Sequence, residues 1–449
     1  MRRWPRGGLW RHSDFLKLWS AETISVFGSQ FTGLALPLAA VLLLDASPFA
    51  VSALVVVEFL PFILLAIPAG VWVDRMRRKP ILVAGDLGRA ALLGSIPLAY
   101  AFDALTLPHL YVVGFLVGVC TVFFDVAYQS YLPSLVERDQ LVEGNSKLEV
   151  SRSTSQLAGP GAAGGIVSAL GAPVAILLDA ISFVVSAAFL FAIRKRETLP
   201  EQAPDAERPS MLADAREGLR FVVRNPYLRA ISMCTGTANL FWSMGGAILV
   251  VYAVRELEMS PALLGLAFSL GNAGPLLAAV ATGRISSRLG VGPTILWTSL
   301  LFSASLLFIP LATKELALPF LVASGVLGGF GAVAYNITQV SYRQAICPER
   351  MQGRMNAAIR FLVWGTMPLG ALLGGTLGTW LGLRTALWIA AIGALFTFLP
   401  ILFSPVPKLR EIPAPVEEPP LPSQAEAAGG LIPAPTTSPA ATPPVEADA

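Results

Sequence analysis

The feature that most constrains the fold is a series of apolar segments, each long enough to cross a bilayer. A hydrocarbon core about 30 Å thick requires about 20 apolar residues per helical span. The segments lie approximately at 20–44, 51–73, 80–101, 109–131, 153–171, 173–193, 227–254, 261–284, 293–312, 318–340, 356–380 and 385–404. Only helices and closed barrels can span lipid, and these segments are too long for barrel strands. We therefore expect an all-α membrane protein with twelve transmembrane helices.

The composition agrees with a lipid environment and offers little for catalysis. Charged residues make up only 14% of the 449 residues, whereas 54% are hydrophobic. A soluble chain carries roughly 25% charged residues. The three cysteines and two histidines are scattered, without the spacing of a disulfide framework or a metal motif. We expect no catalytic residue, metal or cofactor, and therefore no enzyme. The expected partners are the lipid bilayer and a small molecule, not nucleic acid.

The twelve segments fall into two sets of six around the longest internal hydrophilic stretch. This pattern predicts two six-helix bundles with pseudo-symmetry. The predicted parts are a basic N-terminus (1–19), a first bundle (20–193), a linker (194–226), a second bundle (227–404) and a Pro- and Ala-rich tail (405–449). In the linker we expect an amphipathic helix at the membrane surface, although a plain solvated connector is also open. The tail lacks apolar periodicity and is expected to be disordered.

Lysine and arginine residues gather in the loops on one side of the predicted membrane. The side that carries the N-terminus also receives the basic residues of 75–79, 138–152, the linker, 284–288 and 343–354. The opposite side receives only Arg255, Lys314 and Arg384. The positive-inside rule then places both termini in the cytoplasm of a multi-pass protein of the inner (plasma) membrane.

A weak internal repeat relates the two halves. The aligned pairs, each 213 residues apart, are Ser47 and Ser260, Gly70 and Gly283, Arg75 and Arg288, and Pro80 and Pro293. Parallel six-plus-six repeats occur in secondary transporters, which bind substrate between the halves near the midplane.

Two motifs carry a family resemblance. Residues 70–79 read Gly-Val-Trp-Val-Asp-Arg-Met-Arg-Arg-Lys, which resembles the signature loop G-x-x-x-D-R-x-G-R-R/K of the major facilitator superfamily, with Arg77 in place of the second glycine. Residues 159–165 resemble the glycine-proline motif associated with exporters of that superfamily, through Gly159, Pro160, Gly164 and Gly165. Shorter stretches, among them 179–183 and 353–357, look like the branch of the enterobactin exporter and macrolide-efflux-like proteins.

The loop after the second segment is expected to form a gate. Gly70 would let two helices approach closely, and Asp74 could face the N-terminus of another helix. Arg75 and Arg78 could pair with Asp125 at the end of the fourth segment. The alternative is that these arginines only determine topology.

Ionisable side chains inside spans are costly and are functional candidates. They are Glu22, Glu58, Asp86, Arg89, Asp125 and Asp179. Glu22 continues into a polar stripe with Ser25, Ser29 and Thr32, which predicts a cavity lining or a carboxylate that snorkels to the interface. Because burial disfavours the charged form of a carboxyl group, Glu22 or Glu58 could carry a proton.

The remaining polar groups suggest supporting roles. Asp86 and Arg89 are three residues apart and can pair on one helix face, or Arg89 can contact an anionic substrate. Asp179 lies in a stretch typical of the family, which favours a structural hydrogen-bonding role. Asn239 and Asn336 supply uncharged hydrogen bonding to a second half that we expect mainly to shape the pocket.

The resulting hypothesis is a monomeric exporter of a small amphipathic, drug- or siderophore-like molecule, working by alternating access and proton antiport. An uptake permease of the same fold, for a nutrient or an anion, remains open. So does a membrane interaction protein without transport activity.

Overall fold

The computed structural model describes residues 8–195, 197 and 211–411, and within these ranges the chain is helical and contains no strand. The first half consists of α1 (Ser13–Leu43), α2 (Pro48–Asp74), α3 (Arg78–Ala101), α4 (Leu107–Leu135), α5 (Leu141–Leu170) and α6 (Ala172–Phe191). Helix α7 (Met211–Arg224) follows. Three short 3-10 turns flank the spans, at Leu9–Arg11, Arg138–Gln140 and Val406–Lys408.

The second half repeats the order with interrupted helices. Its six spans are α8 (Pro226–Arg255), α9 with α10 (Pro261–Gly271, Ala273–Leu289), α11 with α12 (Val291–Ser305, Phe308–Leu311), α13 (Ala317–Ile346), α14 with α15 (Glu349–Trp364, Thr366–Leu381) and α16 with α17 (Leu383–Leu395, Leu399–Leu402). The fold is therefore two six-helix bundles with twelve spanning helices, as the sequence predicts.

Eleven of these spans are long and apolar enough to cross a membrane. The span outside this set is α5, whose apolar part, residues 153–170, is rich in glycine and serine. Helix α5 nevertheless packs along both α1 and α9. Its low hydropathy thus reflects close helix packing, because small residues let neighbouring helix backbones approach.

The repeated Ser-Pro pairs begin equivalent helices in the two halves. The Ser47 hydroxyl accepts a hydrogen bond from the backbone N–H of Ala50 (3.2 Å) at the start of α2. The Ser260 hydroxyl does the same for Leu263 (3.3 Å) at the start of α9. The proline after each serine occupies the first helical turn, where its missing N–H has no helical partner to lose. The Ser-Pro pair of the internal repeat thus marks matching N-caps in the two halves.

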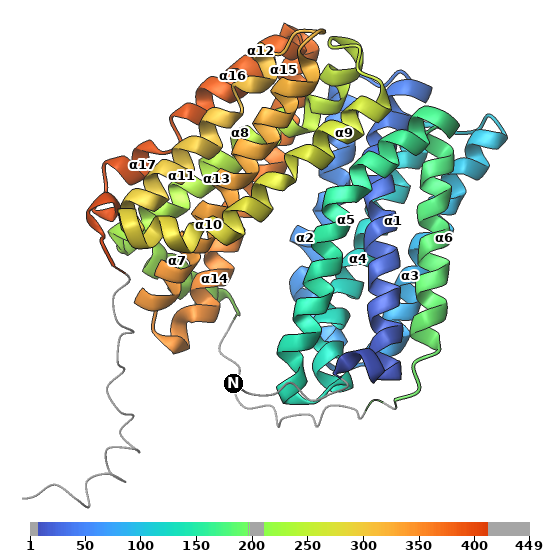
Figure 1. The fold of residues 1–449 in the computed structure, drawn as a ribbon, viewed down its shortest axis with the longest axis horizontal. Coiled ribbons are helices and arrows are strands. Elements are labelled where there is room, and N and C mark those ends of the chain that lie inside the picture. The colour runs from blue at the N-terminus through green and yellow to red at the C-terminus, as the bar shows by residue number, and fades with distance from the viewer. Residues whose placement is uncertain (1–7, 196, 198–210, 412–449) are drawn as a thin grey trace, which may run out of the picture.

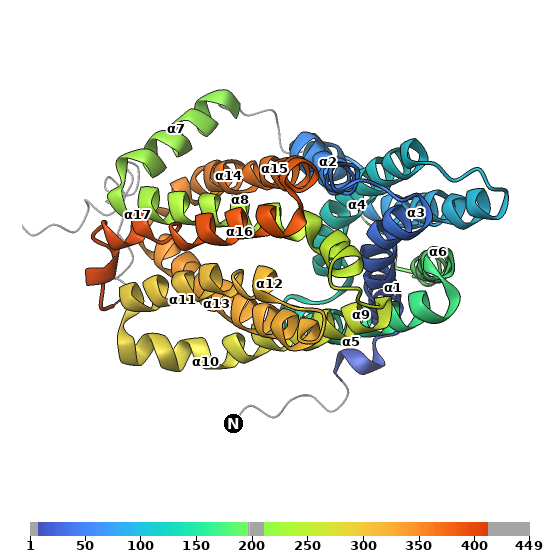
Figure 2. The same cartoon turned by 90° about the horizontal axis from the view of Figure 1, so that it is seen from above.

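The two bundles meet at one end of the molecule and diverge toward the other (Figure 1). We call the meeting end the closed end; there, Arg255 Nη2 in the second half lies 2.5 Å from Asp45 Oδ1 in the first. The other end, which carries the start of α1 and the turn after α2, we call the basic end. Seen from above, α2 lies beside α15 and α5 beside α9 (Figure 2), and both pairs are in contact.

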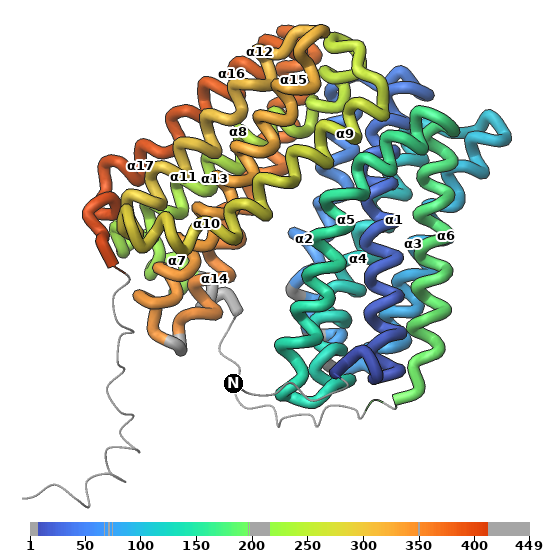
Figure 3. The backbone as a smooth tube through the Cα atoms, in the orientation of Figure 1, coloured from blue at the N-terminus to red at the C-terminus, as the bar shows by residue number. Residues whose placement is uncertain are grey.

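Helix α7 packs on the second bundle near the basic end, beside α14 (Figure 3). A Cβ atom at Gly218 would lie 2.4 Å from the backbone oxygen of Arg354. Glu217 and Arg354 form an ion pair at 2.5 Å, and Val222 is buried in a cluster with Met351 and Met355. The apolar face of this helix therefore has a protein partner.

Two segment boundaries differ from those predicted. Helix α1 begins at Ser13, inside the predicted N-terminal segment, because its polar first turns extend the helix beyond the apolar window. The prediction of disorder from residue 405 is wrong for 405–411, which the structure places against α11. There the backbone N–H groups of Val291 and Gly292 donate to the carbonyls of Arg410 (3.2 Å) and Leu409 (2.9 Å). Residues 412–449 lie outside the described part.

Candidate functional site

The glycine-proline motif of α5 forms one contact between the halves at the closed end. A Cβ atom on Gly164 would lie 2.3 Å from the carbonyl oxygen of Pro261, and one on Gly265 would lie 2.2 Å from that of Pro160. The Gly161 N–H donates to Ser269 Oγ at 2.7 Å. Glycine is required on both helices because no side chain fits between their backbones. We call this contact the α5–α9 seam.

A second contact joins α2 to α15 on the other side of the closed end. A Cβ atom on Gly375 would lie 2.6 Å from Ser52 Cβ and 2.9 Å from Phe49 Cα. The Phe49 N–H donates to Thr379 Oγ1 at 3.2 Å. This α2–α15 seam uses the glycine-rich helix α15, in which Gly374, Gly375 and Gly378 are buried, so both seams consist largely of small residues.

The motif's other residues have different surroundings. Gly159 faces α1, where a Cβ atom would lie 2.4 Å from Gln30 Cγ. Gly165 is exposed, and a Cβ atom there would meet no atom within 4 Å. Of the motif residues, Pro160 and Gly164 thus carry the contact between the halves.

A cavity of about 520 Å³, which we call the central cavity, lies between the halves beside the α5–α9 seam. Its lining is mainly apolar and aromatic, with a few amide and hydroxyl groups. From the first half it includes Ser29, Gln30 and Pro160, and from the second half Trp242, Phe268 and Asn272. Such linings are typical of small-molecule sites.

A second cavity, of about 890 Å³, opens on α1, α4 and α5, and we call it the first-half cavity. It is lined by Glu22, Tyr128, Glu149 and Arg152, with Leu276 from the other half. Glu22 lies within electrostatic range of Asp125 and Arg152. The cavity lining therefore contains two carboxyl groups and a guanidinium from two helices, with Glu22 on α1 and Glu149 and Arg152 on α5.

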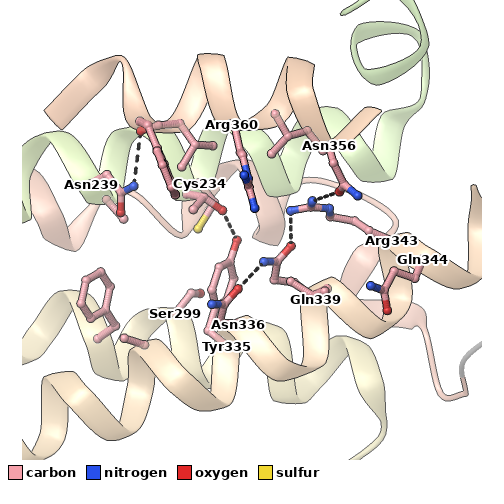
Figure 4. A pocket seen from close by; sticks show the side chains of 18 residues that line it. Cys234, Asn239, Ser299, Tyr335, Asn336, Gln339, Arg343, Gln344, Asn356 and Arg360 are labelled. Carbon is pink, nitrogen blue, oxygen red and sulfur yellow. Dashed lines mark hydrogen bonds between the residues drawn. The ribbon is translucent and has the colours of Figure 1, made fainter. Parts of the chain in front are cut away.

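A third cavity, of about 490 Å³, lies among α8, α11, α13 and α14, and we call it the second-half cavity (Figure 4). Asn239 and Asn336 both line it. A chain of hydrogen bonds runs along α13, from Gln339 Nε2 to Asn336 Oδ1 (2.9 Å) and from Arg343 Nη1 to Gln339 Oε1 (3.0 Å). Arg343 Nη2 also donates to Asn356 Oδ1 at 2.9 Å.

The polar stripe on α1 is divided between two environments, which corrects the prediction of a single cavity lining. Glu22 and Ser29 line the first-half and central cavities. Ser25 is buried, and the Thr32 hydroxyl donates to Asp179 on α6. Residues 22 and 29 lie almost directly above one another on the helix and face the cavities. Residues 25 and 32 are rotated away from that line, toward the neighbouring helix.

Asp179, Asp86 and Arg89 are held inside the first bundle. Asp179 also accepts a hydrogen bond from Ser182 Oγ (3.1 Å). Asp86 and Arg89 form a buried ion pair, and the guanidinium carbon lies 4.2 Å from the ring centroids of both Phe124 and Phe183. Arg89 is thus enclosed between aromatic rings, away from the cavities described above.

Glu58 lies between α2 and α4. A Cβ atom on Gly114 would lie 3.0 Å from Glu58 Cγ, and one on Gly118 would lie 2.7 Å from the Glu58 carbonyl oxygen. The two glycines of α4 therefore make room for this residue at a contact within the first bundle. Glu22, rather than Glu58, opens on one of the three cavities.

The predicted gate residues are not assembled at the basic end in this structure. A Cβ atom on Gly70 would meet no atom within 4 Å, so the predicted close helix approach is absent there. Arg75 is exposed. Arg78 pairs with Glu197 (Nη1 to Oε1, 3.4 Å) rather than with Asp125, which is exposed. The bundles diverge at this end, which explains the missing contacts. The side chain of Asp74 lies outside the described residues.

Three residues that contact the predicted site residues or line a cavity were not predicted from the sequence. Glu197 follows the sixth span and also accepts the Arg78 backbone N–H (2.8 Å). Arg343 and Arg360 line the second-half cavity, although the second half was expected to be uncharged there. Arg343 was counted only as a topology charge because the apolar window ends near 340, whereas α13 continues to Ile346. Within the described part of the chain, no group of His, Cys, Asp and Glu is arranged to hold a metal.

Comparison with known proteins gives a consistent result over most of the chain. Residues 9–432 match the family described as transmembrane secretion effector. The chain is 28% identical over 385 residues to the MFS-type transporter YfiS of Bacillus subtilis, covering 83% of this chain and 88% of YfiS. It is 26% identical over 363 residues to the multidrug efflux pump Tap of Mycolicibacterium fortuitum, covering 79% and 86%.

A more distant relative and a solved structure extend this picture. Macrolide efflux protein A of Streptococcus pyogenes is 21% identical over 402 residues, covering 89% of this chain and 97% of that protein. The crystal structure of a bacterial homologue of the iron transporter ferroportin has a TM-score of 0.71 at 15% identity, covering 87% and 98%. At that identity the structure supports the fold alone. The chain belongs to the transmembrane secretion effector family and is a multi-pass membrane transporter of the major facilitator type, in the macrolide-efflux-like branch.

Proposed function

We propose that this transporter exports a small amphipathic molecule by alternating access, in exchange for protons. The observation that carries the proposal is the central cavity, which both halves line and which lies beside the α5–α9 seam. A site bounded by two bundles that meet at one end can become accessible from the other side when the contacts reverse. Efflux is favoured by the relatives named as multidrug and macrolide efflux proteins.

Glu22 is the proposed proton-coupling residue. It lies in the first-half cavity, within electrostatic range of Asp125. Two carboxylates within this range repel each other, and a proton bound by either group removes that repulsion. Protonation in one state and ionisation in the other would link the proton to the movement of the bundles. Glu58 is the second candidate, and its place between α2 and α4 makes it the less accessible one.

The turn after α2 is proposed to close the basic end in the opposite state. Gly70, Asp74 and Arg75 lie there, and in this structure the bundles diverge at this end. On closing, Gly70 would allow the helix approach that is absent here, and Asp74 would meet the N-terminus of a second-half helix.

The basic end is proposed to face the cytoplasm of the plasma membrane, with both termini on that side. The arginine-rich turns support this orientation through the positive-inside rule. In a variant lacking Cys120, Cys234 and Cys347, a cysteine introduced at Lys314 should react with an impermeant thiol reagent added outside cells. One introduced at the exposed Asp139 should react only after permeabilisation. The reverse pattern would contradict the orientation.

The decisive experiment for function is accumulation of labelled drug-like compounds in cells with and without the protein. We expect the protein to lower accumulation of at least one apolar or amphipathic compound, and a protonophore to abolish the difference. Higher accumulation would indicate uptake instead of export. Export that is insensitive to the protonophore would contradict proton coupling.

A further inference from the structure

The second half contains almost no negative charge. Residues 227–404 include no aspartate and only four glutamates, namely Glu256, Glu258, Glu315 and Glu349. The first three lie in the turns at the closed end, and Glu349 begins α14. Glu349, the first residue of α14, is therefore the only acidic residue within the spans of this half.

Arg343 is such a positive side chain, and its described hydrogen-bond partners are neutral. Nη1 donates to the Gln339 amide oxygen and Nη2 to the Asn356 amide oxygen. Nε is buried and has no partner. The two amides hold the guanidinium in place beside the second-half cavity (Figure 4) without cancelling its charge.

Arg360 brings a second positive charge to the same cavity. It comes from α14, opposite α13, and its guanidinium carbon lies 5.3 Å from the ring centroid of Trp364. Figure 4 shows Arg360 reaching into the space beside Gln339 and Arg343. No aspartate or glutamate is among the described residues that line this cavity. Two guanidinium groups that share a cavity repel each other unless an anion lies between them.

The rest of the lining suits an organic molecule rather than a bare inorganic ion. Phe302, Ile359, Val363 and Trp364 supply aromatic and aliphatic surface. A volume of about 490 Å³ falls in the range of roughly 300–1,000 Å³ that is usual for small-molecule sites.

We propose that the second-half cavity binds the anionic group of the transported molecule, with Arg343 as its principal partner and Arg360 as a second, and that the substrates include amphipathic carboxylates. The proposal rests on the transport function proposed above and specifies its substrate class. A guanidinium is the side chain best matched to a carboxylate because its fork of N–H donors can bind both oxygens. The aromatic and aliphatic wall would hold the apolar part of the same molecule.

The alternative is that Arg343 forms an ion pair with a carboxylate of the first half, and that this pair forms only when the basic end closes. In that case the site would show no preference for an anionic ligand. The two alternatives can be separated by equilibrium binding, which requires no transport.

The test uses the full-length protein in lipid nanodiscs and isothermal titration calorimetry. The probes are 2-naphthoate and its neutral analogue 2-naphthamide, which share ring and size but differ in charge. We expect the wild-type protein to bind the anion at least tenfold more tightly than the amide. Arg343→Gln should remove this preference while leaving the affinity for the amide nearly unchanged. Arg284→Gln, which removes an exposed charge from α10 outside the cavity, should keep it.

A second variant guards against misfolding of Arg343→Gln. Gln339→Glu keeps the arginine but places a carboxylate where the amide oxygen now accepts its hydrogen bond at 3.0 Å. This internal anion should compete with the ligand, so the preference for 2-naphthoate should disappear in a protein that is at least as thermally stable as wild type.

The outcomes are distinct from those of the export assay. Equal affinities for the two probes in wild type, or no measurable binding of the anion, would overturn the anion site. So would a preference that persists in Arg343→Gln and in Gln339→Glu. Loss of protonophore-sensitive export with intact anion preference would instead contradict only the proposed function.

Discussion

At the scale of single residues, four of the acidic side chains on the helices of the first bundle differ in what surrounds them. Asp86 has an arginine partner, and Asp179 has two hydroxyl partners. Glu58 is held against the glycines of α4. Glu22 differs because it opens on a cavity. A proton carrier must exchange with water, so the structure directs attention to Glu22.

Glu22→Gln should uncouple transport. Uphill export driven by a pH gradient in proteoliposomes should be lost, because glutamine cannot release a proton. Downhill movement of the same substrate should continue, because the cavities remain. Glu58→Gln tests the second candidate in the same assay and should retain uphill export if Glu22 alone carries the proton. If both variants export like wild type at every pH tested, coupling by these two residues is ruled out.

Asp86→Asn should destabilise the fold rather than alter coupling. It would leave the Arg89 charge buried between two aromatic rings without its counter-ion, and removal of one partner of a buried pair costs about 3–5 kcal/mol. The thermal unfolding temperature of the detergent-solubilised protein should fall clearly, whereas Asp103→Asn in the exposed α3–α4 turn should leave it unchanged. Adding Arg89→Gln to Asp86→Asn should recover part of the loss. If Asp86→Asn alone is as stable as wild type, the Asp86–Arg89 ion pair does not stabilise the fold.

At the scale of helices, contacts between elements depend on positions where a side chain is absent. The α5–α9 seam brings backbone to backbone at Gly164 and Gly265, and α7 approaches α14 at Gly218. Glycine inside a helix costs about 1 kcal/mol relative to alanine. These helices are therefore intrinsically less stable than alanine-containing ones, at the positions where only glycine permits the close approach.

Gly164→Ala should impair transport at least tenfold, although alanine is the better helix former. Its Cβ atom would lie 2.3 Å from the Pro261 carbonyl oxygen, which forces α5 and α9 apart. Gly165→Ala is the matched control, since its Cβ atom would meet nothing within 4 Å. Initial rates of substrate efflux from cells with equal amounts of membrane-inserted protein would provide the comparison. Similar rates for the two variants would contradict a role for the seam.

At the scale of the whole molecule, one apolar core contains buried side chains of both bundles, and each bundle has smaller buried clusters of its own. The chain after the last span returns to the second bundle, where residues 409 and 410 accept backbone hydrogen bonds from the start of α11. That contact extends the second bundle at least to residue 410.

Truncation should reveal how far the second bundle extends. A chain that ends after Glu411 should keep wild-type transport and thermal stability. A chain that ends after Phe403 should be less stable, because it loses the backbone hydrogen bonds to Val291 and Gly292 and the buried side chain of Val406. Unfolding temperatures and efflux rates of both truncated proteins test this. Loss of transport in the longer, correctly inserted chain would indicate that 412–449 contribute to function.

The sequence was sufficient for the number of spans, the two bundles and the family. Hydropathy reports that a segment is apolar, and spans of this length can only be helical. Hydropathy does not indicate which face of a helix packs against which neighbouring helix. Arg78 therefore received the wrong acidic partner, and Arg343 was assigned outside the membrane because its helix extends past the apolar window. The partner of Gly164 lies about 100 residues away in sequence, which local patterns cannot reveal.

The absence of side chains at the α5–α9 seam has a consequence for the cell as well as for the transporter. A membrane that maintains an ion gradient must be impermeable to ions. A continuous file of water molecules through a protein would let protons or other ions cross and dissipate the gradient. Two helix backbones packed without intervening atoms leave no room for such a file between α5 and α9. Enlarging Gly164 would then do more than slow one substrate: it would open a leak that every gradient-driven process in the same membrane has to offset.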